Sequence, residues 1–248
     1  MGINRNLGGF GASANISGFV ANTQITGLIT CAQHGPIANT KITGLITAPQ
    51  IAPSAIPAGG FSNMQVFTST TPGQTWTSPP TTTKIKVTVV GGGGGGSSQD
   101  CAGNGVGGAG GGAAIRVTPV SAATPYPVTV GAAGISYAVP GTPNNGGAGG
   151  TSSFGSLASA TGGSGGVQGS SGVSGGTGSI PGATTCGFVV AGGSAGGNVS
   201  SPGASSFIGN ATRGIGTSGI APASNYGSGG ASFGHPTAGA AGIVIVEW

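Results

Sequence analysis

Residues that could perform acid–base or nucleophilic chemistry are scarce in this sequence. Its 248 residues include two carboxylates, Asp100 and Glu247, and two histidines, His34 and His235. Glycoside hydrolysis usually needs two carboxylates that flank the scissile bond, but Asp100 follows a run of glycines and Glu247 lies in a distant β-type segment. The segment GGSGG at residues 162–166 has the spacing G-x-S-x-G only formally, because the glycine-rich residues around it do not predict the strand and helix that expose a nucleophilic serine. We therefore expect no catalytic residues and no enzymatic activity.

Metal and cofactor sites are equally hard to find. Cys31, Cys101 and Cys186 are widely spaced and, even with the two histidines, give no metal-ligand spacing, so we expect three small buried side chains. Residues 103–108 match G-x-G-x-x-G, but the Ala- and Gly-rich residues after them do not predict the helix that a bound phosphate needs. We expect no metal, no nucleotide and no other cofactor.

The charge of the chain argues against two classes of partner. Six scattered Lys and Arg residues dominate a net charge of +4, and charged residues make up 3% of the chain. They form no basic stripe interleaved with aromatic residues, so nucleic acid is not an expected partner. No segment approaches the roughly 20 apolar residues of a membrane span, so we expect no membrane insertion. Lys84, Lys86 and Arg116 are expected to be solvated charges on strand faces.

A short repeat occupies the first part of the chain. The sequence ANTQITGLIT at residues 21–30 recurs as ANTKITGLIT at residues 38–47. Thr and Ile favour extended backbone, but one such unit has too little apolar surface to fold alone. We predict an oligomeric stalk over residues 1–57, in which units from several chains wrap one axis; a flexible tether is the alternative. The glycines in residues 58–63 then predict a hinge.

A compact β domain is predicted over residues 64–248. Residues 84–90 alternate between apolar and polar side chains, which is the pattern of a half-buried strand. Residues 243–246 are apolar on both faces, which predicts a central strand that we expect to pair with residues 84–90. The predicted strands are residues 64–69, 74–77, 84–90, 114–118, 126–130, 151–157 and 242–248.

Glycine accounts for 58 residues, roughly three times its usual share. Collagen is excluded because the glycines do not recur strictly at every third residue. A flexible linker is a second alternative, but a linker has no need for the large apolar side chains that are spread through this region. We favour polyglycine-II helices, which have three residues per turn and no internal hydrogen bonds, so that bare backbones can bond side by side.

The predicted fold class is therefore all-β with an irregular glycine-rich region. An extended N-terminal β-repeat stalk is followed by a small β-sheet domain that encloses a polyglycine-II helix bundle. After the hexaglycine at residues 91–96, the predicted rods are residues 105–112, 146–150, 162–166, 175–178, 192–197 and 227–230.

Several of these segments resemble a known family. The sequence KIKVTVVGGGGGG at residues 84–96 resembles the opening of the glycine-rich domains of bacteriophage tail-fibre proteins. The same resemblance extends to QTW at residues 74–76, VTVG at 128–131, GGTSSFG at 149–155 and the segment 239–248. The ITGLIT units look like the short repeats of fibre shafts.

This resemblance implies a receptor-binding protein of the virion, made in the cytoplasm of the host. Its partners would be a bacterial surface receptor, protein or glycan, and other tail or baseplate proteins that bind the N-terminal part of a homotrimer. Two alternatives remain open: a purely structural virion fibre or extracellular filament subunit, and an enzyme that digests surface polysaccharide.

Loop residues beyond the glycine rods are the expected receptor contacts, because aromatic side chains in particular anchor interfaces. Asn144 and Asn145, followed by Gly146, are also a turn signal on their own. The candidate receptor-binding residues are Tyr137, Asn144, Asn145, Arg213, Asn225, Tyr226, Phe233 and His235.

Overall fold

The computed structural model describes residues 60–98, 104–136, 144–182, 186–197, 201–211, 214–215, 218–219, 226–232 and 236–248. All of them belong to one compact unit, Gly59–Trp248. The described residues form strands and irregular segments and include no helix, so none of them forms a helix long and apolar enough to cross a membrane. The predicted stalk over residues 1–57 and the first two hinge residues lie outside the described residues.

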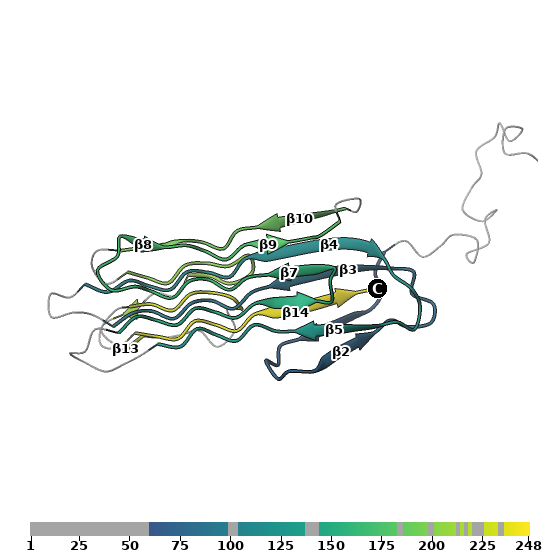
Figure 1. Cartoon of the computed structure of the whole chain (residues 1–248), viewed down its shortest axis with the longest axis horizontal. Coiled ribbons are helices and arrows are strands. Elements are labelled where there is room, and N and C mark those ends of the chain that lie inside the picture. Colours follow the sequence, from purple (N-terminus) through teal and green to yellow (C-terminus); the bar gives the residue numbers. More distant parts are fainter. Residues whose placement is uncertain are drawn as a thin grey trace, which may run out of the picture. The chain divides into compact units, whose positions relative to one another are not determined.

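Two five-stranded antiparallel sheets occupy one end of this unit (Figure 1). The first sheet has the order β1 (Met64–Phe67), β14 (Ile243–Glu247), β3 (Lys84–Val90), β4 (Ala113–Pro119), β10 (Gly187–Val190). The second has the order β2 (Gln74–Thr77), β5 (Pro125–Thr129), β6 (Ser152–Phe154), β7 (Ala158–Ala160), β9 (Gly178–Ser179). Two short ladders pair β8 (Gly172–Val173) with β11 (Ala195–Gly196) and β12 (Gly214–Ile215) with β13 (Ser218–Gly219).

The predicted pairing of the two longest apolar segments is confirmed. Strand β14 lies between β1 and β3, and it pairs with β3 antiparallel, with Val244 opposite Val89. Val244 and Val246 face the main core, while Ile243 belongs to a smaller cluster on the other face of the sheet. Both faces of β14 are therefore apolar because both are partly covered, as the sequence predicts.

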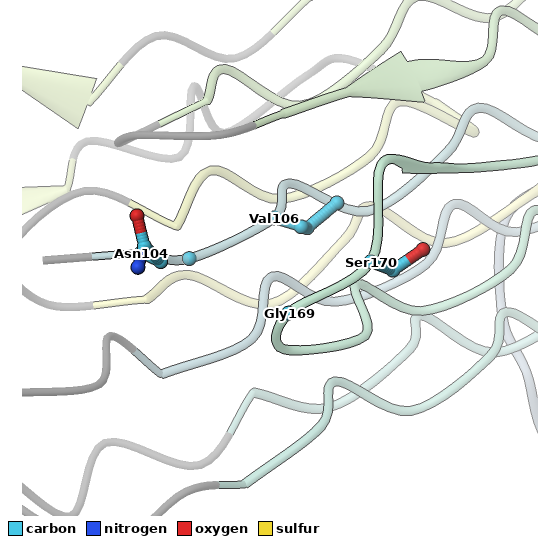
Figure 2. Close-up of a pocket in the computed structure, with 5 residues that line it drawn as sticks. Asn104, Val106, Gly169 and Ser170 are labelled. Atoms are coloured by element: carbon cyan, nitrogen blue, oxygen red, sulfur yellow. The ribbon is translucent and has the colours of Figure 1, made fainter. Parts of the chain in front are cut away.

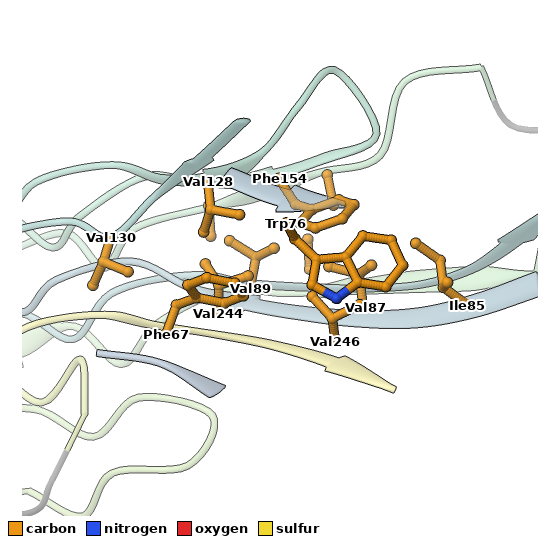
Figure 3. Close-up of a cluster of buried hydrophobic side chains, with 13 residues drawn as sticks. Phe67, Trp76, Ile85, Val87, Val89, Val128, Val130, Phe154, Val244 and Val246 are labelled. Atoms are coloured by element: carbon orange, nitrogen blue, oxygen red, sulfur yellow. The ribbon is translucent and has the colours of Figure 1, made fainter. Parts of the chain in front are cut away.

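The hydrophobic core lies between the two sheets (Figure 3). The first sheet contributes Ile85, Val87 and Val89, whose side chains are fully buried as their alternation predicts. The second sheet contributes Trp76 and Phe154, whose ring centroids lie 5.8 Å apart. Burial of large apolar side chains stabilises a fold by about 1.5–3 kcal/mol each, so these facing strands form a conventional sandwich that anchors the glycine-rich part.

Arg116 corrects one expectation from the sequence. Its side chain is only 7% exposed rather than solvated, because Arg116 lies opposite Val87 in the ladder and so shares the core face of the sheet. Its Nη1 donates hydrogen bonds to the carbonyl oxygens of Leu157 at 2.7 Å and Pro181 at 2.8 Å. The guanidinium thus links β4 of the first sheet to the loops of the second.

The glycine-rich segments bond to one another through their backbones with a period of three. In residues 91–98 every third N–H donates to the same neighbouring segment, over distances of 2.8–3.0 Å. Gly91, Gly94 and Ser97 donate to residues 112, 109 and 106; Gly92, Gly95 and Ser98 to residues 150, 147 and 144; Gly93 and Gly96 to residues 240 and 237. We call residues 91–98 the central segment, and it and the segments bonded around it the glycine array.

Three further segments donate hydrogen bonds to the central segment. Its carbonyl oxygens accept hydrogen bonds of 2.8–2.9 Å from three sources: the N–H of Gly134, those of Gly163 and Gly166 in one segment, and that of Gly230. The central segment therefore has six neighbours, and each amide of residues 91–98 finds a partner without an α-helix or a sheet, as buried backbone groups require. A Cβ atom built on any of the six glycines at residues 91–96 would lie less than 3.0 Å from a neighbouring backbone oxygen. Only glycine fits there.

Peripheral segments of the array need glycine less often. Residues 131–135 read Gly-Ala-Ala-Gly-Ile and residues 237–242 read Thr-Ala-Gly-Ala-Ala-Gly, with glycine at every third position. Gly134 and Gly239 contact other segments closely, whereas Ile135 is 54% exposed. The predicted rods include neither segment, because consecutive glycines are the signal that predicts a rod. A segment with fewer neighbours requires glycine only on the sides that face them.

Serine hydroxyls complete the hydrogen bonding where the array meets other elements. Ser152 of β6 donates from Oγ to the Val90 carbonyl at 2.7 Å and accepts from the Gly131 amide at 2.9 Å. Ser201 accepts from the Gly107 amide at 2.6 Å. These serines are buried, and their bonding agrees with the rule that buried polar groups are satisfied.

Candidate functional site at the distal end of the glycine array

The array extends away from the two sheets (Figure 1). Polar residues lie at its remote end. The central segment leaves β3 at Val90, so Ser97 and Ser98 mark its remote end. The Ser98 backbone N–H donates to the Asn144 carbonyl, and the Asn144 backbone N–H donates to Ser98 Oγ. The Gln168 backbone N–H donates to Asn145 Oδ1 at 3.0 Å. We call residues 97–98, 104–106, 144–145 and 167–170 the distal end.

A pocket of about 170 Å³ opens at the distal end between two segments (Figure 2). Asn104, Gly105 and Val106 form one wall, and Gly169 and Ser170 form the other. The second wall is a turn, held by a hydrogen bond from the Ser170 amide to the Val167 carbonyl at 3.2 Å. Gly169 adopts a left-handed conformation with φ +72°, and a Cβ there would meet nothing within 4 Å. The turn therefore leaves open space beside it.

One backbone amide in the pocket wall, that of Gly105, has no acceptor among the residues that the structure describes. The amides from Val106 to Gly112 each donate a hydrogen bond to the array or to a serine hydroxyl. Gly105 is also buried, yet no described residue accepts a hydrogen bond from its N–H. A buried unpaired donor costs about 1–3 kcal/mol.

The described residues that line the pocket are polar or apolar and carry no charge. Its lining combines the Asn104 amide and the Ser170 hydroxyl with the buried side chain of Val106, and none of its five lining residues carries a charge. Ser170 Oγ donates to the Gly172 carbonyl at 2.8 Å, which fixes the turn. In the adjoining residue Gln168, Nε2 is buried and also has no hydrogen-bond partner. These described residues can offer hydrogen bonds and an apolar contact.

The structure places three of the eight candidate receptor-binding residues. Asn144 and Asn145 lie at the distal end, where they begin an array segment instead of forming the turn that their sequence suggests. Tyr226 lies elsewhere: it packs on Val90, Ala113 and Ile243 beside the first sheet. Tyr137, Arg213, Asn225, Phe233 and His235 lie outside the described residues.

Sequence reasoning missed the residues that line the pocket. The sequence predicts a glycine rod at Gly105 and Val106, offers Asn104 only as part of the rejected nucleotide motif, and predicts no element at Gly169 and Ser170. A usable signal was the Gln-Gly pair at residues 168–169 between segments of the array, since glycine in a polar pair often marks a turn. The pocket itself depends on three-dimensional packing that no local pattern encodes.

Apolar side chains also reach the surface, near the sheets. Phe188 of β10 is 52% exposed and meets Phe207 at a ring-centroid distance of 6.3 Å. Val189 and Ile208 beside them are exposed as well. The rings of Phe188 and Phe207 therefore form an exposed apolar contact beside the edge strand β10.

The described residues give no support for metal chemistry. No group of three or more His, Cys, Asp or Glu side chains gathers among them. The Glu247 carboxylate instead contacts Lys86 Nζ at 2.7 Å across the paired strands. Cys186 is exposed, so the expectation of a buried thiol is wrong at that position; Cys31 and Cys101 lie outside the described residues.

Comparison with known proteins agrees with this architecture. A family model described as a glycine-rich domain matches residues 68–248. No curated protein matches the chain. The matched range includes every strand from β2 to β14 and all segments of the array. Since it spans well over half of the sequence, this chain belongs to the glycine-rich domain family.

Proposed function

We propose that this chain is the receptor-binding protein of a bacteriophage tail fibre and that its distal end contacts a receptor on the bacterial surface. The observation that carries the proposal is the position of the pocket at the end of the array remote from the sheets (Figure 1, Figure 2). The resemblance of residues 84–96 and their neighbours to tail-fibre domains supports the same assignment. A binding surface held on a rigid scaffold is the usual arrangement in recognition proteins.

We also propose that the array segments are polyglycine-II helices. That conformation has three residues per turn, and the period-three hydrogen bonding of the central segment supports it. Its six neighbours correspond to three directions of donation and three of acceptance. The steric exclusion of Cβ atoms at residues 91–96 is the packing that such helices need.

An array of this kind suits a receptor-binding tip for a physical reason. Its segments are fixed by backbone hydrogen bonds to their neighbours, so residues at their ends can change without altering a hydrophobic core. Glycine loses more conformational freedom on folding than other residues, and the many interlocking hydrogen bonds offset that loss. The result is a stiff support for residues that make specific contacts.

The remaining parts of the proposal concern assembly. Residues 1–57, with their ITGLIT repeats, would form the stalk of a homotrimer and attach it to other tail or baseplate proteins of the virion. A chain without such a receptor contact would be a purely structural fibre subunit, and the experiment below separates the two functions.

The test is direct binding of fluorescent full-length protein to bacterial cells. We expect saturable labelling of susceptible strains in a panel, with at least about tenfold weaker labelling by Asn145→Trp, since one lost anchor costs about 1.4 kcal/mol or more. Asn145 is exposed at the distal end. Asn63→Trp is the matched control, because Asn63 is exposed beside β1.

Two results would contradict the proposal. Equal labelling by both variants would place the receptor surface away from the distal end. Absence of labelling on every strain by folded wild-type protein would favour the structural fibre.

A further inference from the structure

We infer that Asn145 is a latent site of deamidation, which the intact glycine array protects and which reacts when the distal end opens. Asn145 is followed by Gly146. Glycine has no Cβ and adopts more backbone conformations than other residues, so its nitrogen reaches the side-chain amide of a preceding asparagine most easily. This property does not depend on receptor binding and would hold for a purely structural fibre as well.

The reaction needs only these two residues and water. The Gly146 backbone nitrogen loses its proton and attacks Cγ of Asn145, which forms a cyclic succinimide and releases ammonia. Water then opens the ring at either of its carbonyl groups. Opening at Cγ restores the normal backbone with an aspartate, whereas opening at the main-chain carbonyl leaves isoaspartate, in which the former side chain carries the backbone. Both products have a carboxylate where the amide was.

The array holds both reacting groups. The Gly146 N–H donates to the Gly166 carbonyl at 2.8 Å, which is a well-formed hydrogen bond. Asn145 Oδ1 accepts a hydrogen bond of 3.0 Å from the Gln168 backbone N–H. The attack removes the proton from the Gly146 nitrogen, so the bond to Gly166 must break first. The native array therefore opposes the reaction, and a molecule must open at this place before Asn145 can react.

Packing explains why residue 146 is glycine in spite of this lability. A Cβ built on Gly146 would collide with the Gly95 carbonyl of the central segment, so a larger residue that would slow the attack does not fit. Asn145 is exposed to solvent, which supplies the water that the reaction consumes. Protection at this position therefore falls to the hydrogen bonds that hold the two residues.

Isoaspartate would make the opening permanent. It lengthens the backbone by a methylene group, whereas the direction of each amide in the array depends on a regular three-residue turn. The Gly147 N–H donates to the Ile135 carbonyl at 2.8 Å, in a different segment from the acceptor of Gly146. A longer backbone just before these two amides would displace both from their acceptors. The modified segment would then keep a chemical record that the distal end had opened.

The test follows deamidation of Asn145 in the full-length protein in mildly alkaline buffer, by peptide mass mapping and by enzymatic methylation of isoaspartate. We expect the native protein to react at least about tenfold more slowly than the same protein in denaturant, because only open molecules react. Asn145→Gln keeps a side-chain amide but forms the cyclic imide far less readily, so it should remove the product at this position.

A pair of variants tests the hydrogen bond itself. In Gly166→Ala the new Cβ would collide with the Val106 carbonyl and displace the acceptor of the Gly146 N–H, so Asn145 should react at least about threefold faster than in the wild type. Gly196→Ala is the matched control, because a Cβ at Gly196 meets no atom within 4 Å, and it should react at the wild-type rate.

Three results with the wild-type protein would overturn the inference, and none depends on the folding of a variant. They are equal rates in the native and denatured protein, no product in denaturant, and aspartate without isoaspartate. Reaction of Gly166→Ala no faster than Gly196→Ala would likewise show that the bond to Gly166 gives no protection.

Discussion

The indole rings of Trp76 and Trp248 meet edge to face with their centroids 5.5 Å apart. Trp76 belongs to β2 of the second sheet, whereas Trp248 directly follows β14 of the first. Their contact therefore joins the two sheets at the end of the core away from the glycine array. Edge-to-face pairs of aromatic rings contribute about 0.5–1.5 kcal/mol beyond simple burial.

Replacement of Trp248 by Ala should lower the free energy of unfolding by about 2 kcal/mol. The side chain is only partly buried, so the loss should fall below the 3–5 kcal/mol of a fully buried Trp. Phe188→Ala is the control, because Phe188 is 52% exposed and should lose less than about 1 kcal/mol. Urea denaturation measures both values, and equal losses would show that the contact between the sheets contributes nothing special.

A single methyl group in the central segment should be more damaging than this large truncation. In Gly95→Ala the new Cβ would collide with the Ile135 carbonyl, which forces the segments apart and weakens several hydrogen bonds. We expect a loss of about 3 kcal/mol or more, or failure to fold. Thermal unfolding of the purified variant is the measurement.

Gly196→Ala is the matched control for that substitution. A Cβ at Gly196 has no atom within 4 Å and the backbone is not left-handed, so the variant should be unchanged or more stable by about 0.4–1 kcal/mol. If Gly95→Ala were tolerated as well as Gly196→Ala, the close packing of the array would be wrong.

Hydrogen exchange should separate the array from a flexible glycine linker. The amides at residues 92–96 are bonded to neighbouring segments, and we expect them to exchange at least about a thousandfold more slowly than the intrinsic rate, as in a cooperatively folded core. The Gly169 amide is exposed and bonded to no described residue, so it serves as the fast internal reference. Equal exchange at the two places would contradict the hydrogen-bonded array.

Arg116→Met should lower the free energy of unfolding by about 2 kcal/mol. The variant keeps an apolar stem but leaves the carbonyls of Leu157 and Pro181 without the donors that Nη1 supplies, and hydrogen bonds to charged groups are worth about 1.5–3 kcal/mol. Lys84→Met tests the same change of residue class at an exposed position of the adjacent strand, where we expect less than about 0.5 kcal/mol. If Arg116→Met left the free energy of unfolding unchanged, the buried guanidinium would not be a structural link.

Local patterns in the sequence predict the sandwich better than the array. Strand β3 has the predicted bounds because apolar and polar side chains alternate along it. The same alternation gives the wrong inward face for β4. Ile115 and Val117 are apolar and are therefore expected to face the core, but Arg116 between them does. Which face of β4 is inward depends on its register with Val87, and this is information from a distant segment.

Segments of the array were predictable where glycines are consecutive, as in the hexaglycine and the predicted rods 105–112, 146–150, 162–166 and 227–230, which all bond to their neighbours. Six consecutive glycines mark the central segment because six neighbours surround it. In residues 131–135 and 237–242 only every third residue is glycine, so the run of consecutive glycines that predicts a rod is missing there. The pocket was even harder to predict from the sequence, because Asn104 and Ser170 come together through the packing of segments far apart in sequence.

The three-directional bonding of the central segment also sets a reading frame for changes in length. An extra residue between Gly92 and Gly96 would rotate each later amide by a third of a turn, toward a different neighbour from the one it now meets. An insertion or deletion of three residues would return the amides to their original directions. Evolution should therefore lengthen or shorten such segments in triplets, while the connections between them are free to vary by single residues.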